Sequence, residues 1–290
     1  MKSKKIKSAE RIRQFESLMR CPVCGGAMTV VDFQSLRCPE KHTFDFAKQG
    51  YVNLLTKPVK MKYEKQLFQA RQKMIAKRGM YQSLHREINR LIAKHADVSA
   101  KPFMLLDLGC GEGSHLHHVL SEFNFAETFG VGIDISKDGI LLAAKTYETV
   151  AWFVSDLADL PFASQSFHVC LNILSPIHYH ECKRVLTENG IVIKVVPGPD
   201  YLQELRAALY ANQEKQVYKN DKTIARFKEH FTIVDEVHVH EQKKWSREAL
   251  EDIIRMTPLA WSAKQENIAA FLKRELREIT IDLRILVGRQ

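Results

Sequence analysis

The chain has 290 residues, of which 45% are hydrophobic and 27% are charged, and these values are ordinary for a globular protein. Its apolar stretches, such as residues 191–196, are far too short to cross a membrane, and we expect neither a membrane span nor a secretory leader. The formal net charge of +9 suits a polyanionic partner, or equally a solvated lysine-rich surface.

The chain begins with two segments of different composition. Residues 1–20 are rich in lysine and arginine, and we expect a basic arm that is frayed at its start and passes into a short helix. Residues 21–57 are rich in cysteine, glycine and turn residues, with too few apolar groups to fold around a core alone. A basic stretch follows over residues 57–78, and Pro58 marks the expected start of a large domain over residues 58–290.

The cysteine-rich segment has the spacing of a zinc site. Its expected ligands are Cys21, Cys24, Cys38 and His42. Four protein ligands leave no open position, so such a zinc is structural and not catalytic. The alternative is a set of reduced cysteines in a small core. Either interpretation indicates a reducing compartment, and we expect a cytoplasmic protein. The remaining thiols are expected to be ordinary buried ones, at Cys110, Cys170 and Cys182.

The rest of the chain has the pattern of an α/β fold. Helices are expected at 63–78 and 81–95, separated at Gly79. From residue 103 onward strands alternate with helices, which predicts a mostly parallel sheet covered on both faces. The strands are expected at 103–108, 128–133, 151–154, 167–173 and 191–196, and the helices at 113–122, 137–148, 178–187 and 199–211. Residues 279–285 alternate as a half-exposed strand, whose antiparallel partner contains Val237 and Val239.

The first of these strands runs into a glycine-rich turn that opens a helix. The turn contains Asp107, Gly109, Gly111, Glu112 and Gly113. Glycine lets the backbone approach a ligand closely. Asp134 ends the next strand, where a carboxylate can accept both hydroxyls of a ribose. The glycine spacing differs from the dinucleotide fingerprint, and the acid before it suits a cationic amino acid group, which favours S-adenosylmethionine. The alternative is a glycine turn without a ligand.

These motifs together resemble the bacterial 23S ribosomal RNA guanine-N1-methyltransferases, which join an N-terminal zinc module to a class I methyltransferase domain. The most specific match covers residues 21–54, and further matches lie at 68–71, 107–113, 134–137, 160–162, 197–199 and 256–261. The resemblance implies a Rossmann-like, mostly parallel seven-stranded sheet, S-adenosylmethionine as cofactor and structural Zn²⁺. It also implies that a guanine N1 in a 23S rRNA hairpin loop accepts the methyl group, that the zinc module recognises this RNA, and that a homodimer is plausible.

The resemblance adds residues to the cofactor site. It carries over contacts at Gly111, Glu112, Tyr81 and Tyr201. In this superfamily an acid near the end of the third strand commonly meets the adenine amino group, and Asp156 is our candidate, although it could equally cap a helix.

The sequence identifies no single catalytic residue. The candidates are Asp156, Asn172 and His178, with Asp159 and His180 near them. Asn172 would bind the guanine edge or simply end a strand, and the histidines would move a proton or lie at an exposed helix start. Two other functions stay open. One is a methyltransferase for a small metabolite, because the fold serves many substrates. The other is an inactive zinc-dependent protein that binds nucleic acid.

Overall fold

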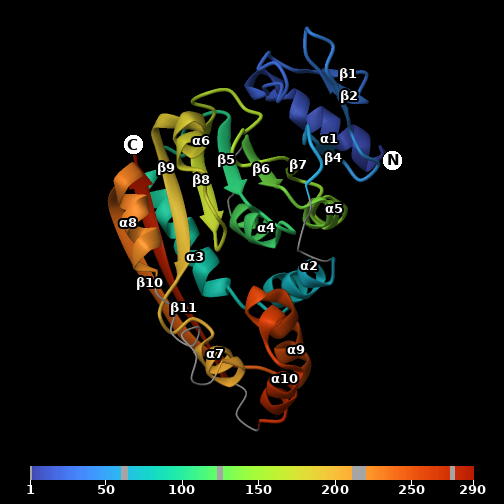
Figure 1. Cartoon of the computed structure of the whole chain (residues 1–290). Coiled ribbons are helices and arrows are strands. Elements are labelled where there is room, and N and C mark those ends of the chain that lie inside the picture. Colours follow the sequence, from blue (N-terminus) through green and yellow to red (C-terminus); the bar gives the residue numbers. More distant parts are fainter. Residues whose placement is uncertain (1, 60–64, 123–126, 211–219, 275–277) are drawn as a thin grey trace.

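The computed structural model describes residues 2–59, 65–122, 127–210, 220–274 and 278–290. Its large sheet has eight strands in the order β10-β11-β9-β8-β5-β6-β7-β4 (Figure 1). These strands are β4 (Tyr51–Asn53), β5 (Phe103–Leu108), β6 (Thr128–Asp134), β7 (Ala151–Val154), β8 (Phe167–Ile173), β9 (Leu186–Pro197), β10 (Thr232–Lys244) and β11 (Glu278–Arg289). The strands from β9 to β4 in this order are parallel, whereas β11 pairs antiparallel with β9 and β10 antiparallel with β11.

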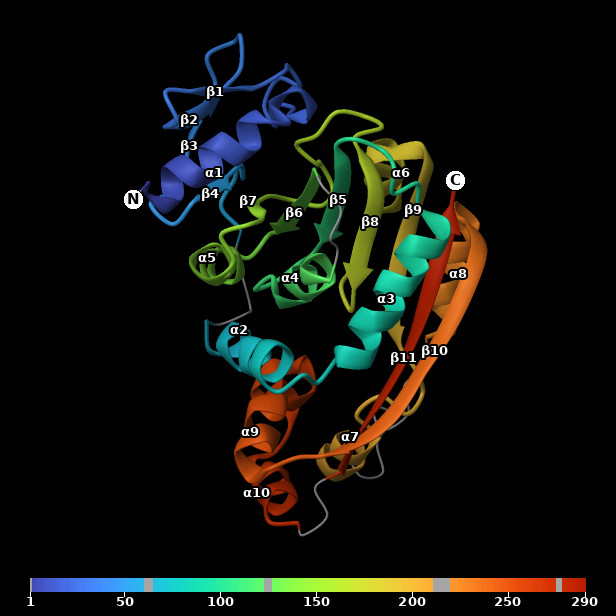
Figure 2. The same ribbon diagram turned by 180° about the vertical axis from the view of Figure 1, so that it is seen from behind.

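Side chains of the central strand β5 alternate between two cores. Phe103 and Leu105 pack with residues of the helices on one face, and Met104 and Leu106 pack with those on the other. The first face is covered by α3 (Gln82–His95), α4 (Ser114–Ser121) and α5 (Lys137–Thr146) (Figure 2). The second face is covered by α1 (Lys4–Arg13), α6 (Tyr179–Val185) and α8 (Asp221–His230). Burial on both faces explains why β5 is a continuous apolar run interrupted only by Asp107.

Further helices lie beyond the carboxyl ends of the parallel strands, where the arrowheads in Figure 1 point. They are α2 (Lys65–Gln72), which continues into a π-helical turn (Lys73–Lys77), α7 (Gln203–Leu209), α9 (Arg247–Met256), a 3₁₀ turn (Pro258–Ser262) and α10 (Gln265–Leu272). The chain order along the sheet reverses at β5, between β6 and β8. In open α/β sheets ligands bind at such a reversal, outside the carboxyl ends of the strands.

The N-terminal segment packs against the β7 side of the large sheet. It contains α1, a 3₁₀ turn (Glu16–Leu18) and a small sheet of β1 (Thr29–Val31), β2 (Ser35–Arg37) and β3 (Thr43–Asp45). The expectation of a frayed arm is wrong. Ser3 caps α1, Ile12 and Phe15 are buried in the second core, and Lys7 pairs with Glu148 at 2.8 Å. The apolar residues at helical spacing pack into the second core of the large domain, so the N-terminal arm is ordered.

Most of the elements predicted for the large domain are confirmed. The β10–β11 ribbon closes the sheet as expected, but the expectation of a half-exposed strand over residues 279–285 is wrong, because β11 lies between β9 and β10 and is buried over most of its length. Cys110, Cys170 and Cys182 are buried, as expected. The eighth strand, β4, comes from the segment that we assigned to the zinc module and extends the sheet by pairing with β7. Residues 63–64 and 211, at the ends of two predicted helices, and Lys60 and Lys62 of the basic stretch, lie outside the described residues. Among the helices that are described, none is long and apolar enough to cross a membrane.

Candidate cofactor cavity and zinc centre

The four predicted zinc ligands come together at one end of the small sheet. The ligand atoms of Cys21, Cys24, Cys38 and His42 all lie within 4.8 Å of one another. The Cys24 and Cys38 sulfurs are 3.6 Å apart, and the Cys38 sulfur is 3.4 Å from His42 Nδ1. A tetrahedron with Zn–S bonds of about 2.3 Å has edges of about 3.8 Å, so the cluster fits zinc closely.

Local backbone geometry aims these ligands. Gly25, with φ of +73°, lets its N–H bond to the Cys21 carbonyl at 2.8 Å, and Cys21 N–H bonds to Gly26 O at 2.8 Å. Burial alone would raise the pKa of Cys38, but hydrogen bonds from Cys24 and from His42 lower it to about 7. The lowered pKa favours the thiolate of Cys38, the form that a metal requires, whereas the pKa of Cys24 is raised, with burial and hydrogen bonds to Cys38 and Cys21 among the causes.

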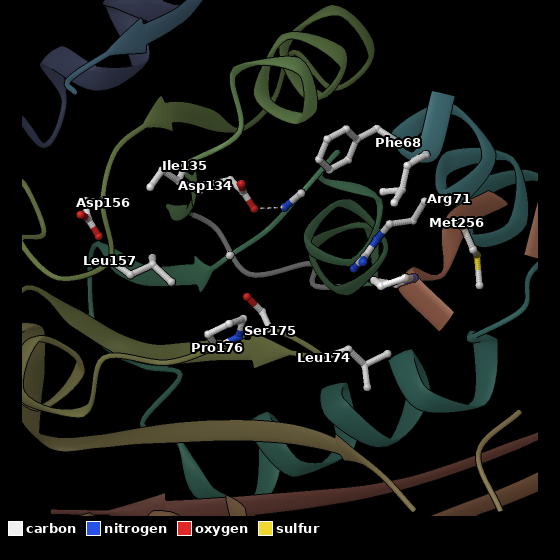
Figure 3. A pocket seen from close by; sticks show the side chains of 14 residues that line it. Phe68, Arg71, Asp134, Ile135, Asp156, Leu157, Leu174, Ser175, Pro176 and Met256 are labelled. Atoms are coloured by element: carbon white, nitrogen blue, oxygen red, sulfur yellow. Dashed lines mark hydrogen bonds between the residues drawn. The ribbon is translucent and has the colours of Figure 1, made fainter. Parts of the chain in front are cut away.

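A cavity of about 350 Å³ lies at the carboxyl ends of β5, β6, β7 and β8. Figure 3 shows Phe68 and Arg71 reaching into it from α2, with Asp134 and Asp156 on the side away from them. The glycine turn and the segment Leu174–Pro176 form further parts of the lining, and the end of α9 and the 3₁₀ turn after it contribute Met256 and Pro258. The complete lining is Leu67, Phe68, Arg71, Gly109, Gly111, Asp134, Ile135, Asp156, Leu157, Leu174, Ser175, Pro176, Met256 and Pro258.

Two carboxylates of the glycine turn are buried, and neither belongs to the cavity lining among the described residues. Asp107 is 1% exposed, and neither of its carboxylate oxygens accepts a hydrogen bond from the described residues. Burial raises the pKa of the fully buried Glu112, against the opposing effects of the Arg71 charge and of hydrogen bonds from Ser114. Burial raises the pKa of Asp107 to about 7, with Asp134 and Glu112 adding to the rise against the charge of Arg71. Arg71 Nε lies 3.8 Å from Glu112 Oε2. An unpaired buried acid, Asp107, beside a cation that lines the cavity fits the ammonium and carboxylate of an amino acid group.

Asp134 holds the turn against the neighbouring strand. Its Oδ2 accepts a 2.8 Å bond from Gly111 N–H, and its Oδ1 accepts a 2.7 Å bond from Ser136 N–H. A carboxylate has further lone pairs, so these bonds leave it able to accept ribose hydroxyls. Gly109 has φ of +79°, and a Cβ there would lie 2.0 Å from Ser175 Oγ, so only glycine fits beneath the segment that carries Ser175.

That segment is a strained turn, and Asn172 holds it in place. Leu174 has φ of +53°, an unfavourable conformation for a branched side chain. Both amide protons of the fully buried Asn172 are used, in bonds to Leu108 O at 2.7 Å and Pro176 O at 2.9 Å, and its oxygen accepts from Lys194. Asn172 therefore positions the turn. Because Asn172 is fully buried and all its polar groups are engaged, its position gives no support to the prediction that it binds the guanine edge.

The other catalytic candidates lie in different surroundings. Asp156 lines the cavity and also accepts a 2.9 Å bond from Ala158 N–H. His178 is an exposed helix cap whose Nδ1 accepts from Glu181 N–H, so the expected acid–base role has no support from its position. Asp159 pairs with Arg20 at 2.6 Å, and His180 is exposed. Of the proposed proton acceptors, only Asp156 borders the cavity.

Tyr81 and Tyr201, two predicted cofactor contacts, lie close together, and neither is among the residues that line the cavity. Their hydroxyls are 2.6 Å apart, and both tyrosines interact electrostatically with Arg71. Gly113, another predicted contact, begins α4 with φ of +82°. A Cβ there would lie 2.4 Å from the Trp152 ring, so this glycine is required by packing.

Comparisons with known proteins match both parts of the chain. A model of the N-terminal zinc ribbon of RlmA matches residues 19–65, and a methyltransferase-domain model matches residues 105–194. YxjB of Bacillus subtilis (strain 168), whose name assigns it to the 23S rRNA (guanine-N(1)-)-methyltransferases, is 42% identical over 94% of this chain and 97% of its own. The 23S rRNA (guanine(748)-N(1))-methyltransferase of Streptomyces fradiae is 30% identical over 93% of this chain and 96% of its own. This chain belongs to the 23S rRNA guanine-N1-methyltransferase family.

Solved structures agree on the fold of this family member. A methyltransferase structure from Anabaena variabilis superposes with a TM-score of 0.51 at 14% identity, covering 70% of this chain and 97% of that one. The cofactor of the methyltransferase domain is S-adenosylmethionine, and the zinc of the ribbon is structural.

Several residues of the cavity were not predicted as site residues. Arg71 and Phe68 lie on α2, Met256 ends α9, and Ser175 and Pro176 form the strained turn. In the sequence, residues 68–71 and 256–261 match the family without indicating a role. Motif matches that flank the glycine turn at long sequence separation are the signal that would have placed them at the cavity.

Proposed function

We propose that this protein transfers the methyl group of S-adenosylmethionine to N1 of a guanine in a hairpin loop of 23S rRNA. The observation that carries this proposal is similarity over nearly the whole chain to relatives named for that reaction, through both the ribbon and the methyltransferase domain. The net charge of +9 is consistent with an RNA substrate. A metabolite methyltransferase would have no use for the ribbon.

Residues around the glycine turn would hold the cofactor. Asp107 and Glu112 would bind its ammonium, Arg71 its carboxylate and Asp134 its ribose hydroxyls, with the adenine between Ile135 and Leu157. Gly109 and Gly111, which line the cavity, would let the backbone approach it, and Gly113 would shape the turn from its place against Trp152. Tyr81 and Tyr201 would act from behind, by positioning Arg71. When bound, the cofactor supplies an electrophilic methyl group on a sulfonium.

The residues of the chain would then place the base and accept one proton. Guanine N1 carries a proton and lies in the pairing edge, so the base must leave its stack to enter the cavity. The rigid turn at Ser175 and Pro176, held by Asn172, forms one wall for the base. Asp156 is the candidate for the proton acceptor, because it is an exposed carboxylate that borders the cavity.

The zinc module would recognise the RNA at a distance from this cavity. In Figure 1 the small sheet lies near the end of the large sheet opposite to α2 and α9. A substrate that reaches both must extend along the molecule, as a hairpin with its flanking stem does. We also retain the homodimer as a prediction, which sedimentation of the purified protein at several concentrations tests.

The experiment that tests the function is primer extension on 23S rRNA. An N1 methyl group blocks base pairing, so reverse transcriptase stops beside the modified guanine. We expect the stop in cells that carry the gene, its loss on deletion, and its return with the wild-type gene but not with Asp107→Asn. Identical stops with and without the gene would refute the rRNA assignment.

A further inference from the structure

A second cavity lies against one wall of the cofactor cavity. It has a volume of about 490 Å³ and shares Leu174, Ser175 and Pro176 with its neighbour. Its other walls are the end of β9 from Lys194 onward and one face of α8. A single turn of the chain therefore separates the two cavities.

The lining of this second cavity is positively charged. It contains Lys194, Lys222 and Arg226, and no aspartate or glutamate belongs to the lining within the described residues. Lys222 and Arg226 are four residues apart on α8, so they project from the same helix face. Both are exposed, and neither forms an ion pair with a carboxylate in the described part of the chain.

Lys194 is a buried cation at this cavity. It is 4% exposed, and its ammonium donates to Asn172 Oδ1 and to Ser175 O, the latter at 2.6 Å. Both acceptors are uncharged. An ammonium has three protons, so one remains for a ligand. Burial lowers the pKa of Lys194 to about 8, and an anion in the cavity would relieve the cost of keeping this charge.

The cationic face of α8 is fixed beside the cavity. Asn220, which precedes α8, donates to Pro197 O at the end of β9 at 2.7 Å. The Arg226 guanidinium lies 5.7 Å from the centre of the Tyr179 ring, which restrains it while leaving its N–H groups for a ligand. Lys194 and Arg226 are therefore held in place beside the cavity, and Lys222 is exposed on the same face of α8 as Arg226.

We propose that this second cavity binds a phosphodiester group of the RNA strand beside the guanine that enters the cofactor cavity. The inference rests on the proposed function. A base that leaves its stack turns about its own backbone, which brings its flanking phosphates to the rim of the pocket. Contacts with phosphates fix the register of a nucleic acid without reading its sequence. Three cations without an acid, one turn away from the methyl acceptor, suit that role.

The test uses three variants, which are Lys222→Ala, Arg226→Gln and the double variant that carries both changes. Each is compared with the control variant Lys228→Ala. Lys228 is also exposed on α8 but does not line the cavity, so it is a matched control for loss of one charge. The probe is a 23S rRNA hairpin, with its affinity measured at several salt concentrations. We expect each single variant to weaken binding roughly fivefold at low salt. The slope of log affinity against log salt should fall by about 0.7–0.9 for each lost contact.

Methylation kinetics give a second readout. The RNA KM should rise in the double variant, while kcat and the affinity for S-adenosylmethionine stay at the wild-type values. A merely structural role would change all three together. If the variants match Lys228→Ala in salt slope and in KM while the wild type methylates the hairpin, the phosphate site is refuted and the function stands.

Failure of the proposed function can be distinguished from failure of the phosphate site. If the wild type methylates no 23S rRNA but the double variant loses RNA affinity and salt slope, the proposed function fails and the phosphate site stands. Inorganic phosphate is the last probe. Variants that lose only inorganic phosphate binding, with unchanged affinity for the hairpin, would overturn the assignment to RNA.

Discussion

The zinc centre and the cofactor cavity differ in how their polar side chains are held and paired. The four zinc ligands lie between Cys21 and His42, and short-range backbone hydrogen bonds aim them at one point. The cavity is lined by residues between Leu67 and Pro258, and beside it Asp107 has no hydrogen-bond partner among the described residues. Local turns therefore prepare the metal site, whereas long-range packing holds unfavourable charge in the cavity that a cationic ligand relieves.

The largest effect is expected from removing a zinc ligand. Cys38→Ser should lose the zinc and the order of the ribbon, because structural zinc contributes about 10–16 kcal/mol in small modules. Metal analysis of the purified protein should give one zinc for the wild type and for Cys182→Ala, and none for Cys38→Ser. Binding of S-adenosylmethionine should survive, because none of the described residues of the ribbon lines the cavity. One equivalent of zinc retained by Cys38→Ser would show that the site is not the predicted one.

Neutralising Asp107, the buried acid beside the cavity, should weaken cofactor binding without lowering the stability of the folded protein. Asp107→Asn removes the proposed partner of the cofactor ammonium and should weaken S-adenosylmethionine binding by about 10- to 150-fold, the equivalent of one charged hydrogen bond. The exposed Asp97→Asn is the control. Calorimetric titration measures both. An unchanged affinity would place the ammonium elsewhere.

The same variant should stabilise the ligand-free protein. The pKa of Asp107 is raised in the folded state, so the folded protein holds its proton more tightly than the unfolded chain does. Stability is then lost as pH rises from about 4 to about 7, and Asp107→Asn avoids this loss. The melting temperature at pH 8 should rise by about 2–4 °C for each kcal/mol regained. A lower melting temperature at pH 8 would show that the carboxylate is stabilised by a partner.

A smaller effect is expected from Arg71, the one cation among the described residues that line the cofactor cavity. Arg71→Met should weaken S-adenosylmethionine binding by roughly 5- to 30-fold, because the carboxylate loses a charged donor but stays partly solvated. Arg71→Lys should recover part of the loss, since it keeps the charge without the planar fork. Arg90→Met, on the exposed side of α3, is the control. Tighter binding by Arg71→Met would mean that Arg71 competes with the cofactor for Glu112.

The sequence predicted the zinc centre more completely than the cavity, for a physical reason. Ligand types and spacing suffice where four residues are held by two short turns, and the glycine turn likewise follows from a local pattern. Arg71 and Ser175 could not be placed, because their positions depend on α2 and a strained turn meeting across the strand ends. Asn172 and His178 were candidates by residue type. In the structure Asn172 accepts a hydrogen bond from the buried Lys194, and His178 caps the start of α6. The three-residue β4 shows the same limit, since only its pairing with β7 makes it part of the large sheet.

The pH dependence of cofactor binding gives the smallest but most specific effect. The pKa of Asp107 is about 7 in the ligand-free protein, and a bound ammonium requires the carboxylate form. Affinity should therefore fall as pH drops below 7, by up to about tenfold per unit, and binding near pH 7 should release protons. Titration calorimetry from pH 5.5 to 7.5, in buffers of different ionisation enthalpy, measures both quantities. Asp107→Asn should bind weakly with a flatter pH profile and release fewer protons. If the wild type and Asp107→Asn gave the same profile, the unpaired acid would not be the group that the cofactor relieves, and the contrast between the two sites would lose its electrostatic basis.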